Sequence, residues 1–260
     1  MSFAVPAGSY DRYMGRYSRK LAPLFAEFAG VRPGMRALDV GCGPGALTES
    51  LAARAGADAV AAADPSESFV ATCAERVPVA DVRRASAESL PWSDSEFDVV
   101  LSQLVVNFLD DAPGAVSEMR RVARSGGVVA ACTWDYRERM EMLRVFWDAA
   151  LAVDPDAPDE GGRMRFATTA ELREQWLAAG VGDVTTDALE VGERYDGFDD
   201  YWQPFTAGVG PGGAYCVALE PERREALRDE CRRRLGDPSG PFELRARAWA
   251  VRGVEHPSSP

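Results

Sequence analysis

The feature that most restricts the fold is a cluster of glycines between an apolar run and a segment of helical character. Residues 37–45 read Ala-Leu-Asp-Val-Gly-Cys-Gly-Pro-Gly. Residues 35–40 form a short apolar run, as in a buried strand, and residues 46–55 are rich in alanine and leucine, as in a helix. Glycine lets the backbone turn tightly and approach a ligand without an intervening Cβ. The pattern therefore predicts a strand, a ligand-binding turn and a helix.

Strand-like and helix-like segments alternate along the first half of the chain. The strand-like segments are 35–40, 59–63, the start of 97–106, and 128–134; the helix-like ones are 16–28, 46–55, 66–76 and 113–123. Such alternation is typical of βαβ units, in which helices cover both faces of a parallel sheet. We therefore predict an α/β fold.

The second half of the chain is less regular. We predict a loop at 154–162, a helix at 168–177, a strand at 184–191, a flexible bend at 208–215, a highly charged helix at 220–235 and a last strand at 242–251 with one polar face. The arginines of the charged helix alternate with acidic residues, which indicates a solvated face and not a nucleic-acid patch.

Charge and composition exclude several classes of partner. The chain has 260 residues, 46% of them hydrophobic, with 29 basic against 41 acidic residues and a net charge of −12. Nucleic acid is a poor candidate partner, because its affinity for proteins comes largely from basic side chains that neutralise phosphates. No apolar run approaches the about 20 residues of a membrane span, so we expect no membrane partner.

Cysteine and histidine usage bears on compartment and metal binding. The five cysteines are widely spaced without a Cys-x-x-Cys pair, and the single histidine, His256, lies near the end of the chain. Neither a disulfide framework nor a zinc site is predicted. The first residues lack the apolar region of a signal peptide, so we expect a cytoplasmic protein.

Three ligand classes compete for the glycine turn. A phosphate-binding P-loop would end in Gly-Lys-Ser/Thr, and no lysine follows the cluster here. A nicotinamide dinucleotide remains possible, since Gly41, Gly43 and Ala46 satisfy G-x-G-x-x-G/A and Asp64 follows at a suitable distance for ribose hydroxyls. Asp39, inside the strand directly before the turn, would face a pyrophosphate poorly and suits a ligand with an ammonium group or cationic centre.

Four sequence motifs follow one another along the chain, and their order makes them more specific together than the glycine cluster alone. They read ALDVGCGPGALTESLA, AAADPSESFV, ASAESLPWSDSEFDVVLSQLVVNFLDD and EMRRVARSGGVVAACTWD. Together they resemble the class I S-adenosylmethionine-dependent methyltransferases, in particular the small-molecule enzymes of the ubiquinone/menaquinone and trans-aconitate type. The resemblance spans about Tyr10 to Val191. It implies a Rossmann-like, seven-stranded, mostly parallel sheet with helices on both faces and an antiparallel C-terminal hairpin.

The resemblance also implies how the chain is organised. Residues 1–260 would form a single methyltransferase domain. Within it, residues 1–33 would be a helical lid, 34–195 the cofactor-binding core, 196–241 a small insertion on the acceptor side, and 242–254 the last strand.

The resemblance assigns S-adenosylmethionine to a set of residues. They are Tyr13, Arg19, Asp39, Gly41, Cys42, Gly43, Asp64, Pro65, Ser86, Ala87, Glu88 and Gln103. The glycines would pass close to the methionine and ribose parts, and Asp39 would organise their loop. Asp64 would bind the ribose hydroxyls, while Pro65 and the Ser86–Glu88 segment would lie near the adenine. Gln103 would present its backbone to the methionine moiety.

The lid segment adds two residues of the same set. In some family members a tyrosine and an arginine there hold the methionine carboxylate, and Tyr13 and Arg19 match them. Arginine suits a carboxylate because its planar fork gives two parallel hydrogen bonds.

Two positions depart from the family pattern. Ser86 stands where the family often has aspartate, so it offers the adenine edge a hydroxyl without charge. Asn107 stands where histidine often follows the fourth strand, so no acid–base role is expected there. Cys42 is interpreted as a small packing residue and not a nucleophile.

The implied reaction is the in-line transfer of a methyl group to a small organic acceptor. No residue stands out as a catalytic base and no metal is predicted. Two groups of residues are candidates for either an acceptor pocket or ordinary packing: Trp134, Asp135 and Tyr136, and Trp202, Phe205 and Tyr215. The alternatives are a non-catalytic module that binds S-adenosylmethionine or S-adenosylhomocysteine, and an NAD(P)-dependent oxidoreductase. The sequence leaves the acceptor, its methylated atom and the oligomeric state open.

Overall fold

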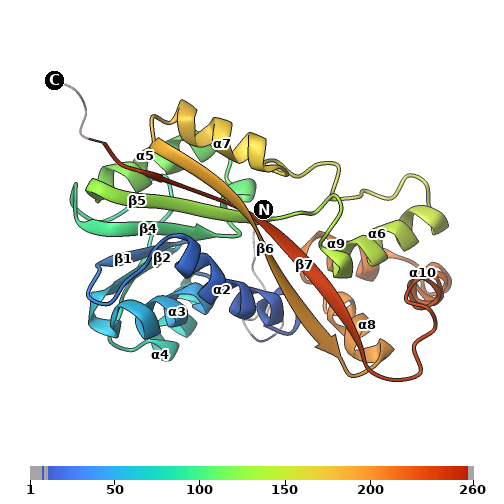
Figure 1. The fold of residues 1–260 in the computed structure, drawn as a ribbon. Helices are drawn as coiled ribbons and strands as arrows, with labels where there is room; N and C mark the ends of the chain where they lie inside the picture. The colour runs from blue at the N-terminus through green and yellow to red at the C-terminus, as the bar shows by residue number, and fades with distance from the viewer. Residues whose placement is uncertain (1–7, 9–10, 257–260) are drawn as a thin grey trace. The chain divides into compact units, whose positions relative to one another are not determined.

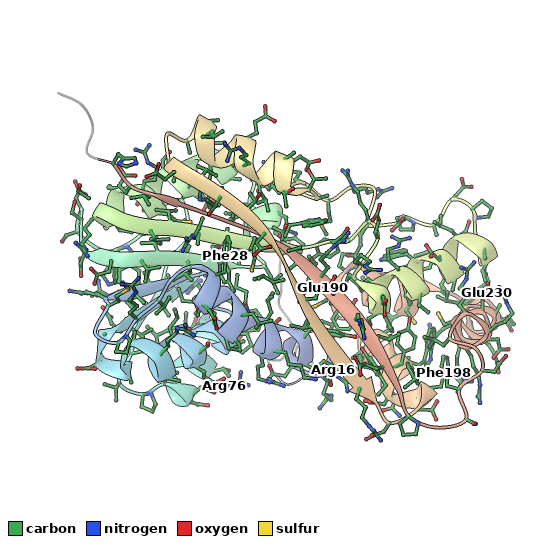
Figure 2. The ribbon with its side chains drawn as sticks, viewed as in Figure 1. Arg16, Phe28, Arg76, Glu190, Phe198 and Glu230 are labelled. Atoms are coloured by element: carbon green, nitrogen blue, oxygen red, sulfur yellow. The ribbon has the colours of Figure 1, made fainter. Side chains whose placement is uncertain are left out.

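The computed structural model describes residue 8 and residues 11–256 (Figures 1 and 2). The chain divides into two compact units. Unit 1 consists of Met1–Tyr17, Trp134–Met164 and Glu190–Arg247, and unit 2 of Ser18–Thr133, Arg165–Leu189 and Ala248–Pro260.

A seven-stranded sheet has the order β3-β2-β1-β4-β5-β7-β6. The strands are β1 (Ala37–Val40), β2 (Val60–Asp64), β3 (Asp81–Arg84), β4 (Phe97–Gln103), β5 (Ala123–Trp134), β6 (Gly182–Tyr195) and β7 (Phe242–Val254). Strand β1 pairs in parallel with β2 and β4, β2 with β3, and β4 with β5. The C-terminal pair is antiparallel. The predicted fold class is confirmed.

Unit 2 contains the parallel strands and the helices that cover them. The helices are α3 (Ala46–Ala55), α4 (Glu67–Arg76), α5 (Ala112–Val122), α7 (Thr169–Ala178) and most of α2 (Arg16–Phe28), with 3-10 turns η2 (Ala57–Ala59) and η3 (Val106–Phe108). Figure 1 shows α5 and α7 on one face of the sheet and α3 and α4 on the other. Every residue of β1 and β2 is buried, as expected for strands covered on both faces.

Unit 1 is built from short helices around an aromatic core. It contains the π-helical turn η1 (Asp11–Gly15), α6 (Glu141–Val153), α8 (Phe198–Thr206), α9 (Gly210–Ala218) and α10 (Pro221–Arg234). The rings of Phe146 and Phe205 stack with centroids 4.3 Å apart, and Trp147 meets Phe146 edge-on at 5.2 Å. These rings join α6 to α8, and their burial supplies much of the packing in this unit.

The predicted charged helix is confirmed as α10, and several of its arginines contact other residues of unit 1. The guanidinium carbons of Arg228 and Arg232 lie 5.2 and 5.6 Å from the ring centroid of Phe198, which Figure 2 labels. Arg234 pairs with Glu230 at 2.9 Å on the same helix. These arginines therefore take part in cation–π and ion-pair contacts within the unit.

The predicted bend at 208–215 is wrong, because most of it belongs to α9 (Gly210–Ala218). Pro211 occupies the first turn, where its missing N–H costs nothing. A Cβ on Gly212 would touch two phenylalanine rings at 3.4 Å, and one on Gly213 would lie 2.7 Å from the backbone of the preceding turn. The glycines therefore permit close packing and do not mark flexibility.

Three further elements differ from the sequence prediction. Strand β3 and helix α6 were not predicted; β3 has no buried residue, so it lacks a hydrophobic pattern. Strand β5 begins at Ala123, earlier than expected, and runs through Gly126 and Gly127. The predicted loop at 154–162 is confirmed.

In the part of the chain that the structure describes, no helix has the length and apolarity needed to cross a membrane.

Trp176 on α7 provides a test of the packing in unit 2. Its side chain has 0% exposure, and its Nε1 donates to the carbonyl of Val129 at 3.0 Å. Trp176→Phe removes that buried hydrogen bond and leaves a gap beside the carbonyl, so the free energy of unfolding should fall by about 2–4 kcal/mol. Urea denaturation followed by circular dichroism measures this. The neighbouring Leu177→Ala, at a side chain 49% exposed, is the control, and equal losses in both variants would contradict the packing argument.

Candidate functional site

The Asp64 carboxylate at the end of β2 organises the candidate site in unit 2. Its Oδ2 accepts from the backbone N of Gly43 at 2.9 Å, and its Oδ1 accepts from the backbone N of Ser66 at 2.8 Å. The residue is 7% exposed, and burial raises its pKa even though both hydrogen bonds oppose that shift. One side chain thus fixes the glycine turn and the start of α4 together.

The glycine turn requires glycine for two separate reasons. Gly41, Gly43 and Gly45 have φ of 76°, 53° and 100°, in the left-handed region that other residues rarely adopt. A Cβ on Gly41 would also lie 2.5 Å from a methyl carbon of Val105. At Gly43, by contrast, a Cβ would meet nothing within 4 Å. The turn is therefore tightly packed at its start and open at Gly43.

The backbone N–H groups of the turn donate hydrogen bonds to acceptors in and beside the turn. Those of Gly41 and Cys42 both donate to the carbonyl of Ala63, at 2.8 and 2.9 Å, and that of Gly45 donates to Cys42 at 3.0 Å. Pro44 has no N–H, and Gly43 donates to the carboxylate described above. The turn consequently presents few free donors to an anion.

Asp39 places a second carboxylate beside the turn. Its Oδ2 accepts from the hydroxyl of Thr48 at 2.7 Å, whereas its Oδ1 is buried and has no hydrogen-bond partner in the described chain. The side chain has 0% exposure, and burial, with a smaller contribution from Asp64, raises the pKa of Asp39 to about 7. A buried acceptor without a donor is costly, so this oxygen is suited to a ligand that supplies one.

Gln103, the last residue of β4, adds a third acceptor. Its Nε2 donates to the carbonyl of Ser18 at 3.2 Å, while its Oε1 is buried and has no partner among the described residues. The sequence predicted only a backbone role for this residue. That role stays a prediction, and the side chain offers an additional hydrogen-bond acceptor.

The predicted adenine-side residues follow β2 and β3. Ser86 is exposed, Ala87 is buried and Glu88 is half-buried. The backbone N of Ala85 donates to the carbonyl of Asp64 at 3.2 Å, which holds this loop beside the end of β2. Apart from Arg19, the structure therefore brings the predicted residues of unit 2 to the carboxyl ends of neighbouring parallel strands, where α/β sheets place ligands.

The loop that follows β2 is also fixed. Pro65 is exposed, and its carbonyl accepts from Nε of Arg84 at 3.1 Å. Arg76, labelled in Figure 2 on α4, donates from Nη1 to the carbonyl of Pro44 at 2.9 Å. The surroundings of the turn are thus held by hydrogen bonds from two arginines.

Comparison with known proteins agrees with this arrangement. Residues 38–131 match a family model described as Methyltransferase domain. A putative type II methyltransferase from Anaeromyxobacter dehalogenans has the same fold, with a TM-score of 0.63, 23% identity, and coverage of 91% of this chain and 97% of that one. Residues 38–131 are therefore similar to a methyltransferase domain, and the chain shares the fold of a solved methyltransferase.

Curated relatives match this chain over part of their length. An uncharacterized protein of Mycobacterium bovis is 32% identical over 130 residues, which is 49% of this chain and 47% of the relative. A malonyl-[acyl-carrier protein] O-methyltransferase of Erwinia billingiae is 34% identical over 133 residues, or 51% of each chain. The chain therefore spans about half the length of the curated relatives it matches.

The two predicted lid residues belong to different compact units. Tyr13 lies in unit 1, is 4% exposed, and meets Phe205 edge-on with ring centroids 5.4 Å apart. Arg19 lies in unit 2 and is exposed on α2. Their shared role at the methionine carboxylate stays a prediction. Tyr10, which the resemblance includes in the lid, is outside the described residues.

Cys42 has the surroundings of a packing residue. It is 6% exposed and packs with Cys73 and Ala62. A hydrogen bond with Cys73, followed by burial, raises the pKa of the Cys42 thiol and so disfavours the reactive thiolate. All five cysteines are free.

Several residues that were candidates for an acceptor pocket have structural partners in unit 1. Asp135 is 2% exposed and its Oδ2 accepts from Arg247 Nε at 3.0 Å and Nη2 at 2.5 Å, so its charge is already paired. Phe205 and Trp202 belong to the aromatic core of unit 1, with ring centroids 6.2 Å apart. No cluster of three or more side chains suited to a metal occurs within residues 11–256.

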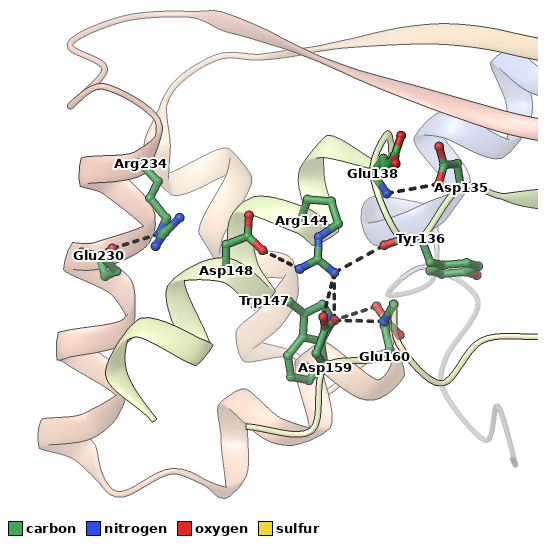
Figure 3. A network of polar contacts seen from close by, with 11 residues as sticks. Asp135, Tyr136, Glu138, Arg144, Trp147, Asp148, Asp159, Glu160, Glu230 and Arg234 are labelled. Atoms are coloured by element: carbon green, nitrogen blue, oxygen red, sulfur yellow. Dashed lines mark hydrogen bonds and ion pairs between the residues drawn. The ribbon is translucent and has the colours of Figure 1, made fainter. Parts of the chain in front are cut away.

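Sequence reasoning missed Glu160, a buried carboxyl in unit 1. It is 5% exposed, and its Oε1 accepts from the indole Nε1 of Trp147 at 3.0 Å (Figure 3). Nothing in its local sequence distinguishes it, because it stands in a loop rich in aspartate, proline and glycine. Its side chain is held by Trp147 of α6, a contact that only the folded structure brings into view.

Asp39 predicts a definite dependence of stability on pH. The pKa of Asp39 is about 7 in the folded protein and about 3.8 for an aspartate in the unfolded chain. Between these two pH values the folded state therefore holds a proton that the unfolded state has lost. The contribution of Asp39 to the free energy of unfolding is complete below about pH 4. It is lost as the pH rises through 7, and the total loss is at most on the order of 4 kcal/mol. Asp39→Asn should remove that loss.

The measurement is the urea midpoint of the wild type and Asp39→Asn at pH 5 and pH 8. The variant should gain stability relative to the wild type at the higher pH. Asp58→Asn, at an exposed position, serves as the control. A constant difference between wild type and Asp39→Asn at both pH values would contradict the assignment.

Proposed function

We propose that unit 2 binds S-adenosylmethionine and that the protein transfers its methyl group to a small organic acceptor. The observation that carries the proposal is that the site around the glycine turn offers a ligand hydrogen-bond acceptors rather than donors. The N–H groups of Gly41, Cys42, Gly43 and Gly45 donate within the protein, whereas Asp39 Oδ1 and Gln103 Oε1 are buried acceptors without donors in the described chain. The ligand carries an ammonium group and two ribose hydroxyls, which are donors, and it lacks phosphates.

The same polarity disfavours a nicotinamide dinucleotide. A pyrophosphate is bound by free N–H groups at such a turn, and the dianion would lie near the Asp39 carboxylate. The Asp64 carboxylate is compatible with either ligand, since each of its oxygens has a further lone pair for a ribose hydroxyl. Discrimination therefore rests on the turn and on Asp39.

The bound cofactor supplies a methyl group activated by its sulfonium. The task left to the protein is to hold the acceptor in line and to exclude water, which can contribute about 7–11 kcal/mol to lowering the barrier. Asp64 and the turn would fix the adenosyl part, and Asp39 would favour the positive end of the ligand. The net charge of −12 supports a small organic acceptor over nucleic acid. A cytoplasmic location stays a prediction.

The activity is tested with S-adenosylmethionine labelled in its methyl group. The purified chain is incubated with a pool of small metabolites and, separately, with protein and nucleic acid. Label should enter the small-molecule fraction. Binding of S-adenosylhomocysteine without transfer to any fraction would indicate a non-catalytic binding module, and transfer into nucleic acid or protein would contradict the acceptor class.

Asp64→Asn tests the cofactor site. Asparagine retains one acceptor but places an amide donor against the N–H of Gly43 or Ser66, so the turn loses a hydrogen bond. Affinity for S-adenosylhomocysteine, measured by titration calorimetry, should fall at least about tenfold, equivalent to 1.4 kcal/mol. Asp58→Asn, with the same change of charge, should bind like the wild type. Unchanged affinity in Asp64→Asn would place the ligand elsewhere.

A further inference from the structure

Two buried side chains of unit 2 are each hydrogen-bonded at one polar atom only. The amide of Gln103 donates from Nε2 to the carbonyl of Ser18 on α2 at 3.2 Å, and Oδ2 of Asp39 accepts from the hydroxyl of Thr48 on α3 at 2.7 Å. The remaining oxygen of each side chain is buried and has no partner among the described residues. All four residues belong to unit 2. An unpaired buried acceptor is costly, and a ligand that supplies donors would recover that cost.

The strand register places both side chains on the same face of the sheet. Strands β1 and β4 pair in parallel, with Asp39 beside Leu101. Register partners on neighbouring strands point to the same face, and so do side chains two residues apart on one strand. Gln103 therefore lies on the face of Asp39. The two strands are neighbours, about 5 Å apart, so one ligand group can lie between the two unpaired oxygens.

Helix α2 determines the direction of the Gln103 amide. The carbonyl of Ser18 can only accept a hydrogen bond, so the amino end of the amide must face it. The amide oxygen is consequently directed away from Ser18. The Gln103 side chain is 8% exposed, which restricts its alternative rotamers. Its Oε1 is therefore a fixed acceptor and cannot exchange places with Nε2.

Two contacts hold the end of β4 beside the glycine turn. The hydroxyl of Ser102 donates to the carbonyl of Val40, the residue directly before the turn, at 3.0 Å. A Cβ on Gly41 would lie 2.5 Å from a methyl carbon of Val105, so the chain that follows β4 packs closely on the start of the turn. Gln103 lies between these two contacts in the sequence. It therefore belongs to the candidate site around the turn.

The order of the strands determines which part of the ligand can reach Gln103. Asp64, which has lone pairs for the ribose hydroxyls, ends β2, and β1 lies between β2 and β4. Gln103 is thus on a strand about 10 Å from the one that would hold the ribose. The amino-acid end of the ligand is left to occupy this position. Its carboxylate is an acceptor and would repel Oε1, whereas its ammonium group has three donors.

We propose that the side-chain oxygen of Gln103 accepts a hydrogen bond from the ammonium group of the bound ligand, and that α2 sets this specificity by fixing the amide. This inference rests on the proposed function. Gln103 thereby favours an adenosyl ligand that carries an amine and opposes a carboxylate in the same place. The carboxylate of Asp39 on the neighbouring strand supplies the negative charge, so the two side chains have complementary roles.

The test measures the affinity of the full chain for three ligands by titration calorimetry. S-adenosylhomocysteine has both the ammonium and the carboxylate, its 2-oxo analogue lacks the ammonium, and its decarboxylated analogue lacks the carboxylate. Gln103→Met is nearly isosteric and removes the amide oxygen. Affinity for the two ligands with an ammonium group should fall about tenfold, as expected for one hydrogen bond to a charged group, and affinity for the 2-oxo analogue should not fall.

Two further variants separate this role from support of the fold. Gln203→Met makes the same substitution at an exposed position of α8 and should bind all three ligands like the wild type. Gln103→Glu keeps an oxygen acceptor of the same shape and adds a charge, so it should prefer the ligands with an ammonium group at least as strongly as the wild type does. Gln103→Glu also decides the question if Gln103→Met does not fold.

An equal loss of affinity for all three ligands in Gln103→Met would show that the amide only supports the fold, and would overturn the proposal. Unchanged affinity of that variant for S-adenosylhomocysteine would do the same, as would a Gln103→Glu variant that no longer prefers the ligands with an ammonium group. Failure of the wild type to bind S-adenosylhomocysteine would instead overturn the proposed function, so the two failures are distinguishable.

Discussion

The arrangement of unit 2 depends on one carboxylate that accepts two backbone N–H groups. Asp64 holds Gly43 on one side and Ser66 on the other, and its own carbonyl accepts from the loop after β3. Three connections of the sheet are thereby fixed around the end of one strand. The same bonds remove N–H groups from solvent, so the turn becomes a poor anion site and a suitable neighbour for a ligand rich in donors.

Unit 1 has a different chemical character from unit 2. Its core is aromatic, and Glu160 is a carboxyl that burial has left without a counter-ion. Burial raises the pKa of Glu160 to about 7, and groups with such shifts are found preferentially at functional sites. Asp135, only 2% exposed, shows the contrasting structural solution, because Arg247 pairs with it through two nitrogens. The two carboxyl groups would look equivalent in the sequence.

The sequence allowed prediction where a local pattern determines the result. The turn at 41–45 and the strand before it were predicted because glycines at left-handed φ and an apolar run leave few alternatives. Glu160 was not predicted, because its burial depends on residues distant in the chain. The helix at Gly210–Ala218 was missed because glycine was interpreted as flexibility, whereas it permits helices to pack closely. Strand β3 lacks a buried residue and so gave no hydrophobic signal.

The central claim is that the turn accepts an adenosyl amino acid and not a pyrophosphate. Thermal unfolding in the presence of S-adenosylhomocysteine, NAD⁺, NADH or NADP⁺ tests it most directly, since a ligand at about 100 times its Kd stabilises the folded state by about 2.7 kcal/mol. The account predicts a rise in Tm with S-adenosylhomocysteine alone. A rise with a dinucleotide and none with S-adenosylhomocysteine would contradict it.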